Sequence, residues 1–166
     1  ADGVLATFAR RGIEGRVLRL GLPPGPGLQE RAREGRLAAM LEVCAETGRP
    51  WLLLAHHRAD QAETVLFRAL RGSGPGGLAA MAPERAEAAA LVLRPLLGVA
   101  PALLEAVVVA AGLEAVRDPT NADPRFARTG MRRSLGDPAG TGPAVAGLAE
   151  AASAFRRRRA DAEAAV

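Results

Sequence analysis

The sequence predicts an α/β fold in which helices cover both faces of a parallel sheet. Short apolar segments alternate along the chain with longer segments whose apolar residues recur at helical spacing, a pattern typical of strand–helix–strand units. The run Trp51–Ala55 is apolar at every position, as expected for a strand buried on both faces. The length of 166 residues fits one domain, for which ~150 residues is a usual size.

Glycines and prolines mark the ends of the predicted elements. Gly12, Gly48 and Gly112 each follow a segment with helical spacing and predict its end. The predicted helices are residues 4–9, 28–47, 60–71, 101–111 and 123–135, with a C-terminal helix from residue 144. The predicted strands are residues 15–20, 51–55 and 91–93. We expect one domain over residues 1–135, followed by a linker and a helix over residues 136–166.

The helix after the apolar run has the clearest pattern. Its apolar residues form one stripe, made of Ala62, Val65, Leu66, Ala69 and Leu70. Asp60 is the expected N-cap, and Glu63 three residues later is its expected partner in a capping box. Gly72 is expected to end the helix.

The composition excludes several classes of protein. All 22 basic residues are arginine, which excludes a Walker A loop and a Schiff-base lysine. The net charge of +4 and the isoelectric point of about 11.0 permit a nucleic-acid partner. A genome biased toward arginine and alanine codons explains the same composition equally well.

The single cysteine and the apolar runs limit where the chain can work. Cys44 is alone, which excludes an internal disulfide and every site that needs paired cysteines. No apolar run approaches the ~18 residues of a membrane span, and the first residues carry no signal-peptide pattern. We therefore expect a protein of the cytoplasm.

The segment from His56 to Thr64 carries the first candidate site. It connects the end of a predicted strand to the start of a helix, where open α/β sheets bind their ligands. Asp60 and Glu63 lie on the first turn, and with His56 they could hold Mg²⁺ or orient an ammonium group. The alternative is that both carboxylates only cap the helix and complement its dipole.

The second candidate is a glycine-rich loop. Gly72, Gly74 and Gly77 match the spacing of a dinucleotide-binding loop, but they follow a helix instead of a strand. We expect a mobile loop from which Arg71 can reach a phosphate group.

The third candidate is a polar and basic cluster toward the C-terminus. Asp118 and Asn121 precede Arg125, Arg128 and Arg132, whose spacing places the arginines on one helix face. Such a face suits a triphosphate or a nucleic-acid backbone, and the alternative is a solvated surface. The run Arg156–Arg159 extends all round a helix and is expected to be solvated.

Read together, five segments resemble the tRNA(Ile)-lysidine synthetase family of the PP-loop (N-type ATP pyrophosphatase) superfamily. Residues 32–36 resemble the family's AREARY helix, and residues 56–64 resemble its HHxDDQAET motif. Residues 71–78 resemble RGSGxxGL, and the segments 94–97 and 118–132 complete the match. The order and spacing hold over about residues 15–135. The resemblance implies an adenine nucleotide alpha hydrolase-like fold, a Rossmann-like arrangement of three layers.

The resemblance also implies an activity. Family members use ATP to adenylate the wobble cytidine of a tRNA(Ile) with a CAU anticodon, after which free L-lysine displaces AMP and lysidine is formed. The expected ligands are therefore ATP, Mg²⁺, L-lysine and this tRNA.

Residue by residue, the resemblance assigns roles to the candidate sites. Asp60 matches the acidic position for Mg²⁺ and lysine, with Glu63 and His56 beside it as catalytic candidates. The residues expected to bind ATP or RNA are Arg33, Arg36, Arg71, Arg94, Asp118, Asn121, Arg128 and Arg132.

Two departures from the family pattern affect these expectations. Ala59 stands where the family has the first aspartate of its DD pair, which weakens the metal site or transfers its role to Asp60. The Ser-Gly-Gly-x-Asp-Ser loop that the family uses to bind pyrophosphate does not occur in the sequence. We therefore expect a fragment without its N-terminal unit, inactive by itself, whose exposed sheet edge favours self-association.

Two alternative functions remain open. A tRNA-thiolating enzyme of the same superfamily shares a similar HHRxD segment, but it needs clustered cysteines. A non-catalytic, arginine-rich domain that binds RNA or a nucleotide would need neither ATP hydrolysis nor lysine.

Overall fold

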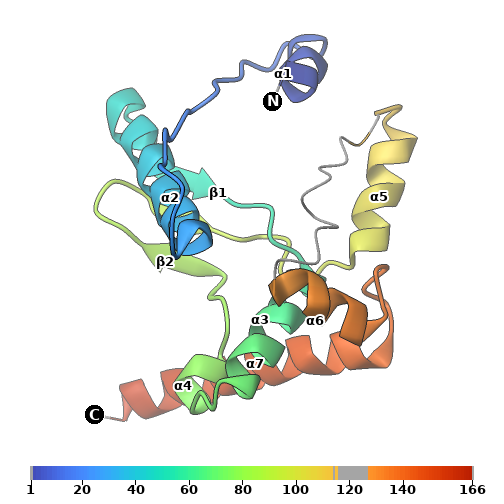
Figure 1. The fold of residues 1–166 in the computed structure, drawn as a ribbon. Helices are drawn as coiled ribbons and strands as arrows, with labels where there is room; N and C mark the ends of the chain where they lie inside the picture. Colours follow the sequence, from blue (N-terminus) through green and yellow to red (C-terminus); the bar gives the residue numbers. More distant parts are fainter. Residues whose placement is uncertain (1, 114, 116–126, 166) are drawn as a thin grey trace. The chain divides into compact units, whose positions relative to one another are not determined.

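A computed structural model describes residues 2–113, 115 and 127–165 of the chain, and Figure 1 shows their elements. The helices are α1 (Asp2–Ala9), α2 (Leu28–Thr47), α3 (Arg58–Leu70), α4 (Pro75–Leu78), α5 (Pro101–Ala110), α6 (Ala127–Leu135) and α7 (Pro143–Ala164). The strands are β1 (Trp51–Leu53), β2 (Glu84–Ala86) and β3 (Leu91–Leu93). This combination of helices with a small sheet confirms the α/β class.

The chain divides into two compact units. The first, here called the strand unit, contains Ala1–Leu53 and Glu84–Leu93. The second, here called the helical unit, contains Leu54–Pro83 and Arg94–Val166. The three strands belong to the first unit, while the glycine-rich loop and α3 belong to the second.

The sheet of the strand unit is mixed, so the expectation of a wholly parallel sheet was wrong. Its order is β1-β3-β2, with β1 parallel to β3 and β2 antiparallel to β3. Strand β2 was missed because its residues are all exposed and include glutamate and alanine, which strands disfavour. A short turn joins β2 to β3, closed by a hydrogen bond from the Glu87 amide to the Ala90 carbonyl.

Strand β1 is not buried on both faces as its apolar sequence predicted. Trp51 and Leu53 are each 65% exposed, whereas Leu52 between them is half-buried. Alternate side chains of a strand point to opposite faces, and helix α2 contacts this strand. One face of β1 therefore carries exposed apolar side chains.

The expected strand at residues 15–20 was also wrong, because this segment joins no strand in the described part of the chain. Part of its alternation comes from contact of Leu20 with α2. Leu18 and Leu20 are half-buried while the residue between them is exposed, and Leu20 lies against Gly35 of α2. On the other side, the Arg16 guanidinium forms an ion pair with Glu46, with Nη1 and Oε2 2.8 Å apart.

The predicted helix ends agree with the structure where it is described. Helix α2 ends at Gly48, whose φ of 62° is the left-handed conformation that glycine adopts at low cost. Helices α5 and α7 both begin with proline at their first position, where a missing amide hydrogen costs nothing. The first residues of the predicted helix 123–135 lie outside the described residues, and α6 is described from Ala127.

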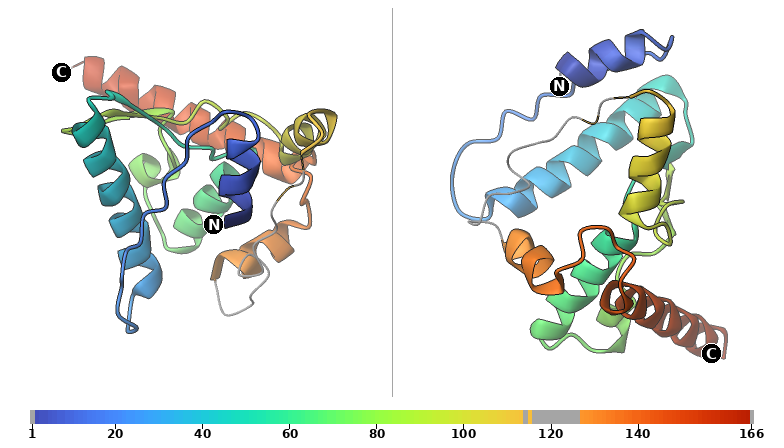
Figure 2. Two further views of the ribbon diagram at one scale, coloured as in Figure 1. Left: turned by 90° about the horizontal axis from the view of Figure 1, so that it is seen from above. Right: turned by 90° about the vertical axis from the view of Figure 1, so that its right-hand side faces the viewer.

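The helical unit is organised around α3 and α7. Helix α7 packs along α3 and also contacts α4, while α6 contacts α3; the three helices α3, α4 and α7 stay together in all views (Figures 1 and 2). The fully buried side chains at this contact include Ala62 of α3 with Val145 and Ala152 of α7. None of the helices in the described part of the chain combines the length and apolarity that crossing a membrane requires.

The turn between α6 and α7 depends on a glycine with no room for a side chain. Gly140 has a φ of 67°, and a Cβ atom added there would overlap Pro101 Cδ at the start of α5. The same turn is fixed by Asp137, whose carboxylate accepts hydrogen bonds from the amides of Gly140 and Gly142 at 2.9 and 2.7 Å. Gly136 has a similar φ of 59° with nothing near its added Cβ.

We predict that Gly140→Ala destabilises the helical unit more than Gly136→Ala. Both variants place alanine in the left-handed conformation at a cost of about 1–2 kcal/mol, but only Gly140→Ala also forces Pro101 to move, for about 1–3 kcal/mol more. The free energies of unfolding from urea titrations followed by circular dichroism measure the difference. Equal losses in the two variants would contradict the close contact.

Candidate functional site

Helix α3 begins at Arg58, and its N-cap is His57, three residues before the expected N-cap Asp60. The Nδ1 atom of His57 accepts a hydrogen bond from the Asp60 amide at 3.4 Å, and the His57 amide donates to Asp60 Oδ2 at 2.9 Å. These two bonds form a capping box with Asp60 as its third helical residue. The expectation of Asp60 as N-cap with Glu63 as its partner was therefore wrong. Histidine is not among the preferred N-cap residues, which is why the sequence pattern favoured the aspartate.

The capping box fixes the Asp60 carboxylate at the positive end of α3. Its side chain is 14% exposed, and Oδ2 lies 3.3 Å from Nδ1 of His57. A carboxylate in the first turn is stabilised by the helix dipole. The structure therefore shows the capping role expected as the alternative for Asp60.

Glu63 is placed differently from Asp60, although both belong to the first two turns of α3. It is 1% exposed and lies among buried neighbours on the same helix. His56, which precedes the N-cap, is half-buried. The structure therefore brings Asp60 to the start of the helix and Glu63 into the interior of the helical unit.

The residues described do not form a magnesium site by themselves. Mg²⁺ prefers a full octahedral shell of oxygen ligands, and no group of three or more His, Cys, Asp or Glu side chains suited to a metal occurs among them. Asp60 already uses Oδ2 in the capping box. A metal-binding role for Asp60 stays a prediction, since Mg²⁺ is usually bound through one or two carboxylates together with waters and substrate phosphates.

Arg58 connects the start of α3 to the turn at residues 96–99. Its guanidinium donates to the Gly98 carbonyl from Nε at 3.0 Å and from Nη2 at 2.7 Å. Its amide donates to the Val99 carbonyl at 3.0 Å. Sequence analysis did not single out this residue, and no signal in the sequence indicates that an arginine at this position has two backbone acceptors.

At the other end of α3, Arg71 is exposed as predicted. It forms the C-cap of the helix, and its guanidinium lies 4.7 Å from the centre of the Phe67 ring. A guanidinium held over an aromatic face keeps its donors available at the ring edge. Arg71 is therefore positioned beside the glycine-rich loop with its charge accessible.

The segment after the glycine-rich loop is held by a set of side chains that we call the carbonyl clamp, formed by Gln61, Arg68, Arg94 and Arg156. They donate to the backbone carbonyls of residues 77 and 79–82. Hydrogen bonds from charged donors are worth about 1.5–3 kcal/mol each. The clamp therefore fixes the polypeptide at the exit of the loop.

Gln61 makes the most complete of these contacts. Its Nε2 donates to the Met81 carbonyl at 2.8 Å, and its Oε1 accepts from the Met81 amide at 3.1 Å. The side chain is 1% exposed, so its amide must find partners within the protein. The motif HHxDDQAET includes this glutamine, but only the structure shows that it is a structural residue.

Arg68 holds the same segment from the next turns of α3. Its Nη1 donates to the carbonyls of Gly77 and Ala80 at 2.7 and 3.1 Å. Ala80 has a φ of 52°, a left-handed conformation that costs a residue with a Cβ about 1–2 kcal/mol. Strain of this kind persists where the surroundings over-determine the backbone, and the carbonyl clamp provides that constraint.

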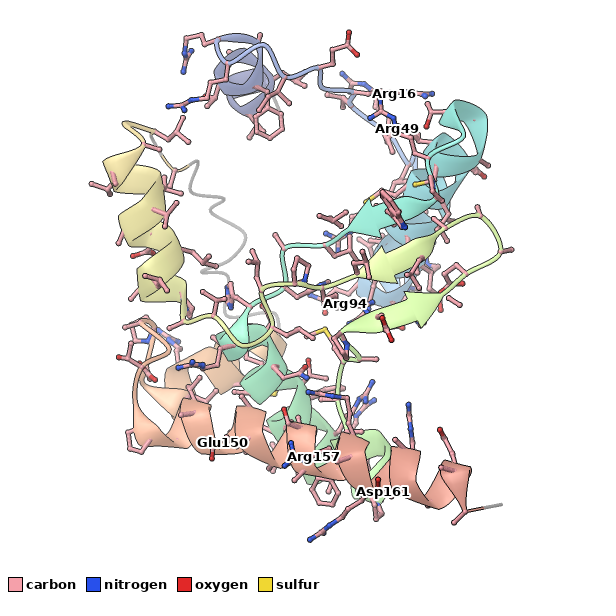
Figure 3. All side chains as sticks on the ribbon, turned by 180° about the vertical axis from the view of Figure 1, so that it is seen from behind. Arg16, Arg49, Arg94, Glu150, Arg157 and Asp161 are labelled. Carbon is pink, nitrogen blue, oxygen red and sulfur yellow. The ribbon has the colours of Figure 1, made fainter. Side chains whose placement is uncertain are left out.

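Arg94 and Arg156 complete the clamp. The sequence suggested a ligand contact for Arg94 and solvent for Arg156, but both side chains donate to backbone carbonyls. Arg94 is 8% exposed and its Nη1 donates to the Ala82 carbonyl at 2.9 Å; Figure 3 shows it among the other side chains. This contact gives Arg94 a bracing role, and its predicted contact with phosphate or RNA stays a prediction. Arg156 was expected to be solvated, but it is half-buried. Burial lowers the pKa of Arg156, with a further contribution from the charges of Arg157 and Arg159.

The remaining predicted residues belong to the strand unit or are not described. Arg33 and Arg36 lie on α2 in the strand unit and are exposed, and Nε of Arg36 donates to the Ala32 carbonyl at 3.3 Å. Asp118 and Asn121 lie outside the described residues, as do the side chains of Arg128 and Arg132 on α6.

Comparison with known proteins relates the sequence to one family. A family model described as a PP-loop domain matches residues 10–138. A "tRNA(Ile)-lysidine synthase" of Ralstonia nicotianae is 47% identical over 139 residues, which cover 83% of this chain and 30% of the relative. Proteins with the same name from Methylobacterium sp. (strain 4-46) and Methylobacterium nodulans are 43% and 41% identical over 161 residues, or 96% of this chain. The chain spans 30–48% of the length of these three relatives.

We predict that His57→Ala lowers the free energy of unfolding by about 1 kcal/mol, the usual value of a lost N-cap. His57→Asn should retain most of the stability, because an asparagine side chain accepts the same hydrogen bond from the Asp60 amide. Urea titrations of the two variants and the wild type measure both effects. Loss of the same size in both variants would mean that the imidazole ring stabilises the chain by packing and not by capping.

We predict a larger loss for Gln61→Leu. The substitution preserves volume but leaves the Met81 amide without its Gln61 partner, at about 1–3 kcal/mol for a buried polar group, while the Met81 carbonyl keeps its hydrogen bond from Arg156. The same urea titrations apply, with exposed Gln29 on α2 as the site of a control substitution, Gln29→Leu. A Gln61→Leu variant as stable as this control would contradict the role of Gln61 in the carbonyl clamp.

Proposed function

The chain belongs to the PP-loop domain family, and from that membership we propose that it serves the synthesis of lysidine on tRNA(Ile). The single observation that carries the proposal is the identity of 41–43% over 161 residues with relatives named tRNA(Ile)-lysidine synthase. The motif segments at residues 32–36, 56–64, 71–78 and 94–97 all lie within the matched family range. The proposed substrates are ATP, L-lysine and a tRNA(Ile) with a CAU anticodon.

The proposed reaction has two steps. First, the C2 carbonyl oxygen of the wobble cytidine attacks the α-phosphate of ATP, so that an O–P bond forms and pyrophosphate leaves. Next, an amine of lysine attacks C2, a C–N bond forms, and AMP leaves with the oxygen. Mg²⁺ enters the proposal only as the ion that ATP phosphates carry with them.

Three features of the described residues support this assignment. Asp60 presents a carboxylate at the start of α3, and a carboxylate is the group that a lysine ammonium requires. Arg71 is exposed beside the glycine-rich loop, where a guanidinium can bind a phosphate. Arg33 and Arg36 are exposed on α2, where they can contact RNA or ATP. The same role is proposed for Arg128 and Arg132 from the resemblance alone.

A second candidate function is RNA or nucleotide binding without catalysis. It is favoured by one observation: no Ser-Gly-Gly-x-Asp-Ser segment occurs in the 166 residues. For the same reason we propose that this chain does not form lysidine by itself. A tRNA-thiolating activity is disfavoured, because Cys44 is the only cysteine of the sequence and is 7% exposed on α2.

The first experiment compares binding and chemistry in one preparation. Fluorescence anisotropy with a labelled tRNA(Ile) transcript measures affinity, and a transcript with adenosine at the wobble position is the matched control. Incorporation of radioactive lysine in the presence of ATP and Mg²⁺ measures the reaction. Binding that prefers the wobble cytidine, without incorporation of lysine, supports a domain that serves lysidine synthesis but does not form lysidine by itself.

Other outcomes separate the candidates. Incorporation of lysine would support the synthase and overturn the proposed inactivity of this chain. Binding that ignores the wobble base and weakens steeply with salt would favour the binding domain. No binding of either transcript would contradict both tRNA-binding functions.

Self-association and a location in the cytoplasm stay predictions. Sedimentation would check the first, and cell fractionation the second.

We predict that Asp60→Asn abolishes binding of L-lysine while changing the free energy of unfolding by less than about 1 kcal/mol. The asparagine oxygen can still accept the hydrogen bond from the His57 amide, but it lacks the charge that attracts an ammonium group. Isothermal titration calorimetry with L-lysine, with and without ATP, measures binding. Asp60→Ala is the control, because it removes the charge and the capping bond together.

If the asparagine variant binds lysine as the wild type does, Asp60 only caps the helix. If the wild type itself does not bind lysine in either condition, the assignment of this carboxylate to lysine fails in the same way.

A further inference from the structure

We infer that Arg156 of α7 is a positioning residue for the glycine-rich loop at residues 71–78. The inference rests on the proposed function for the role of that loop, and on the contacts of α7 for the role of Arg156. Helix α7 begins at Pro143, after the family match ends at residue 138. The residue thus lies outside the range of the PP-loop family model, although the Methylobacterium relatives match over 96% of the chain.

Helix α7 presents Arg156 to the loop from a buried stripe. Val145 and Ala152 on this stripe are fully buried, and Arg156 follows four residues after Ala152, which places it on the same face. The contacts of α7 are with α3, which precedes the glycine-rich loop, and with α4, which forms the second half of the loop (Figures 1 and 2). The stripe therefore directs Arg156 toward the exit of the loop.

The hydrogen bonds of Arg156 are those of an anchored group. Nη1 donates to the carbonyls of Ala79 and Met81, at 3.2 Å in both cases. Nη2 donates to Ser153 Oγ at 2.8 Å, and the Ser153 hydroxyl donates to the Ala149 carbonyl at 3.2 Å. A planar guanidinium can reach several acceptors in fixed directions, which an ammonium group cannot do.

Arg156 completes the clamp from α7, a helix that is distant from α3 in the sequence. Gln61 and Arg68, both on α3, bind the carbonyls of residues 77, 80 and 81, while Arg156 binds those of residues 79 and 81. Met81 thus has its carbonyl shared by Gln61 and Arg156. Two helices distant in sequence are tied through this one peptide segment.

The loop itself is exposed between two fixed ends. Its first end is the C-cap Arg71, and its second end is the segment that the clamp holds. Gly72, Gly74 and Gly76 between these ends are exposed. Since a loop with a loosened end samples more conformations, loss of Arg156 would let the glycines move relative to Arg71 and to a bound phosphate.

Amide hydrogen exchange tests the clamp directly. The amides of Ser73, Gly77, Ala79 and Ala80 donate within the loop region to the carbonyls of Arg68, Gly74, Pro75 and Gly77, so each reports local opening. We expect Arg156→Ala to raise their exchange by at least about tenfold, with less than threefold change at the buried residues 62–65 of α3. Arg157→Ala is the matched control, since Arg157 is the exposed next residue of α7 (Figure 3) and carries the same charge; less than about twofold change is expected there.

Arg156→Lys provides a milder variant for the case in which Arg156→Ala does not fold. It keeps the charge but loses the fork, and we expect an increase in loop exchange of about threefold. An unchanged loop in the folded variants would overturn the inference. Equal acceleration in the loop and in α3 would also overturn it, because it would show general support of the helical unit.

The effect of Arg156 on tRNA binding is tested by the affinity for the CAU-anticodon tRNA(Ile) transcript. We expect Arg156→Ala to weaken binding at least about fivefold, Arg156→Lys less, and Arg157→Ala by less than about twofold. An equal loss in Arg157→Ala would assign the effect to surface charge and overturn the positioning role. If the wild type does not bind the transcript, the proposed function fails, while the exchange experiment still decides whether Arg156 holds the loop.

Discussion

Backbone carbonyls that are withdrawn from water need hydrogen-bond donors, and the helical unit is organised around one segment with that need. Residues 77–82 belong to no long helix or strand, yet Ala79 and Met81 are buried. The donors come from side chains of α3, of α7 and of the segment after β3. Because these elements are distant in sequence, their shared contact with one peptide segment fixes their arrangement within the unit.

Much of the local structure could be predicted from the sequence, because it depends on local rules. Gly48 ends α2 and Pro101 begins α5 for reasons that involve only the neighbouring residues. The α/β class followed from the alternation of element types. Where alternation had another cause, as in the contact of Leu20 with Gly35 of α2, the same rule predicted a strand at residues 15–20 that the described part of the chain does not contain.

The candidate site was less predictable, because the chemistry of arginine and glutamine side chains is not determined by their spacing. Arg94 lies in a motif that suggests phosphate binding and Arg156 in a run that suggests solvent, yet both donate to backbone carbonyls. Only the fold determines which carbonyls lack partners. In contrast, the position of Asp60 at the start of α3 could be predicted, although its cap is a histidine that the usual preferences do not favour.

The exposed Trp51 makes tryptophan fluorescence a probe of the strand unit. It is the only tryptophan, and it belongs to the strand unit, where it is 65% exposed. Its fluorescence therefore reports the state of β1 and not that of the carbonyl clamp. The far-ultraviolet circular dichroism comes mainly from the helical unit, which contains α3–α7, with a smaller contribution from α1 and α2 of the strand unit. Denaturation curves from the two signals coincide only if both units unfold in one cooperative step, so a single sample distinguishes a chain that unfolds as a whole from one whose two units unfold separately.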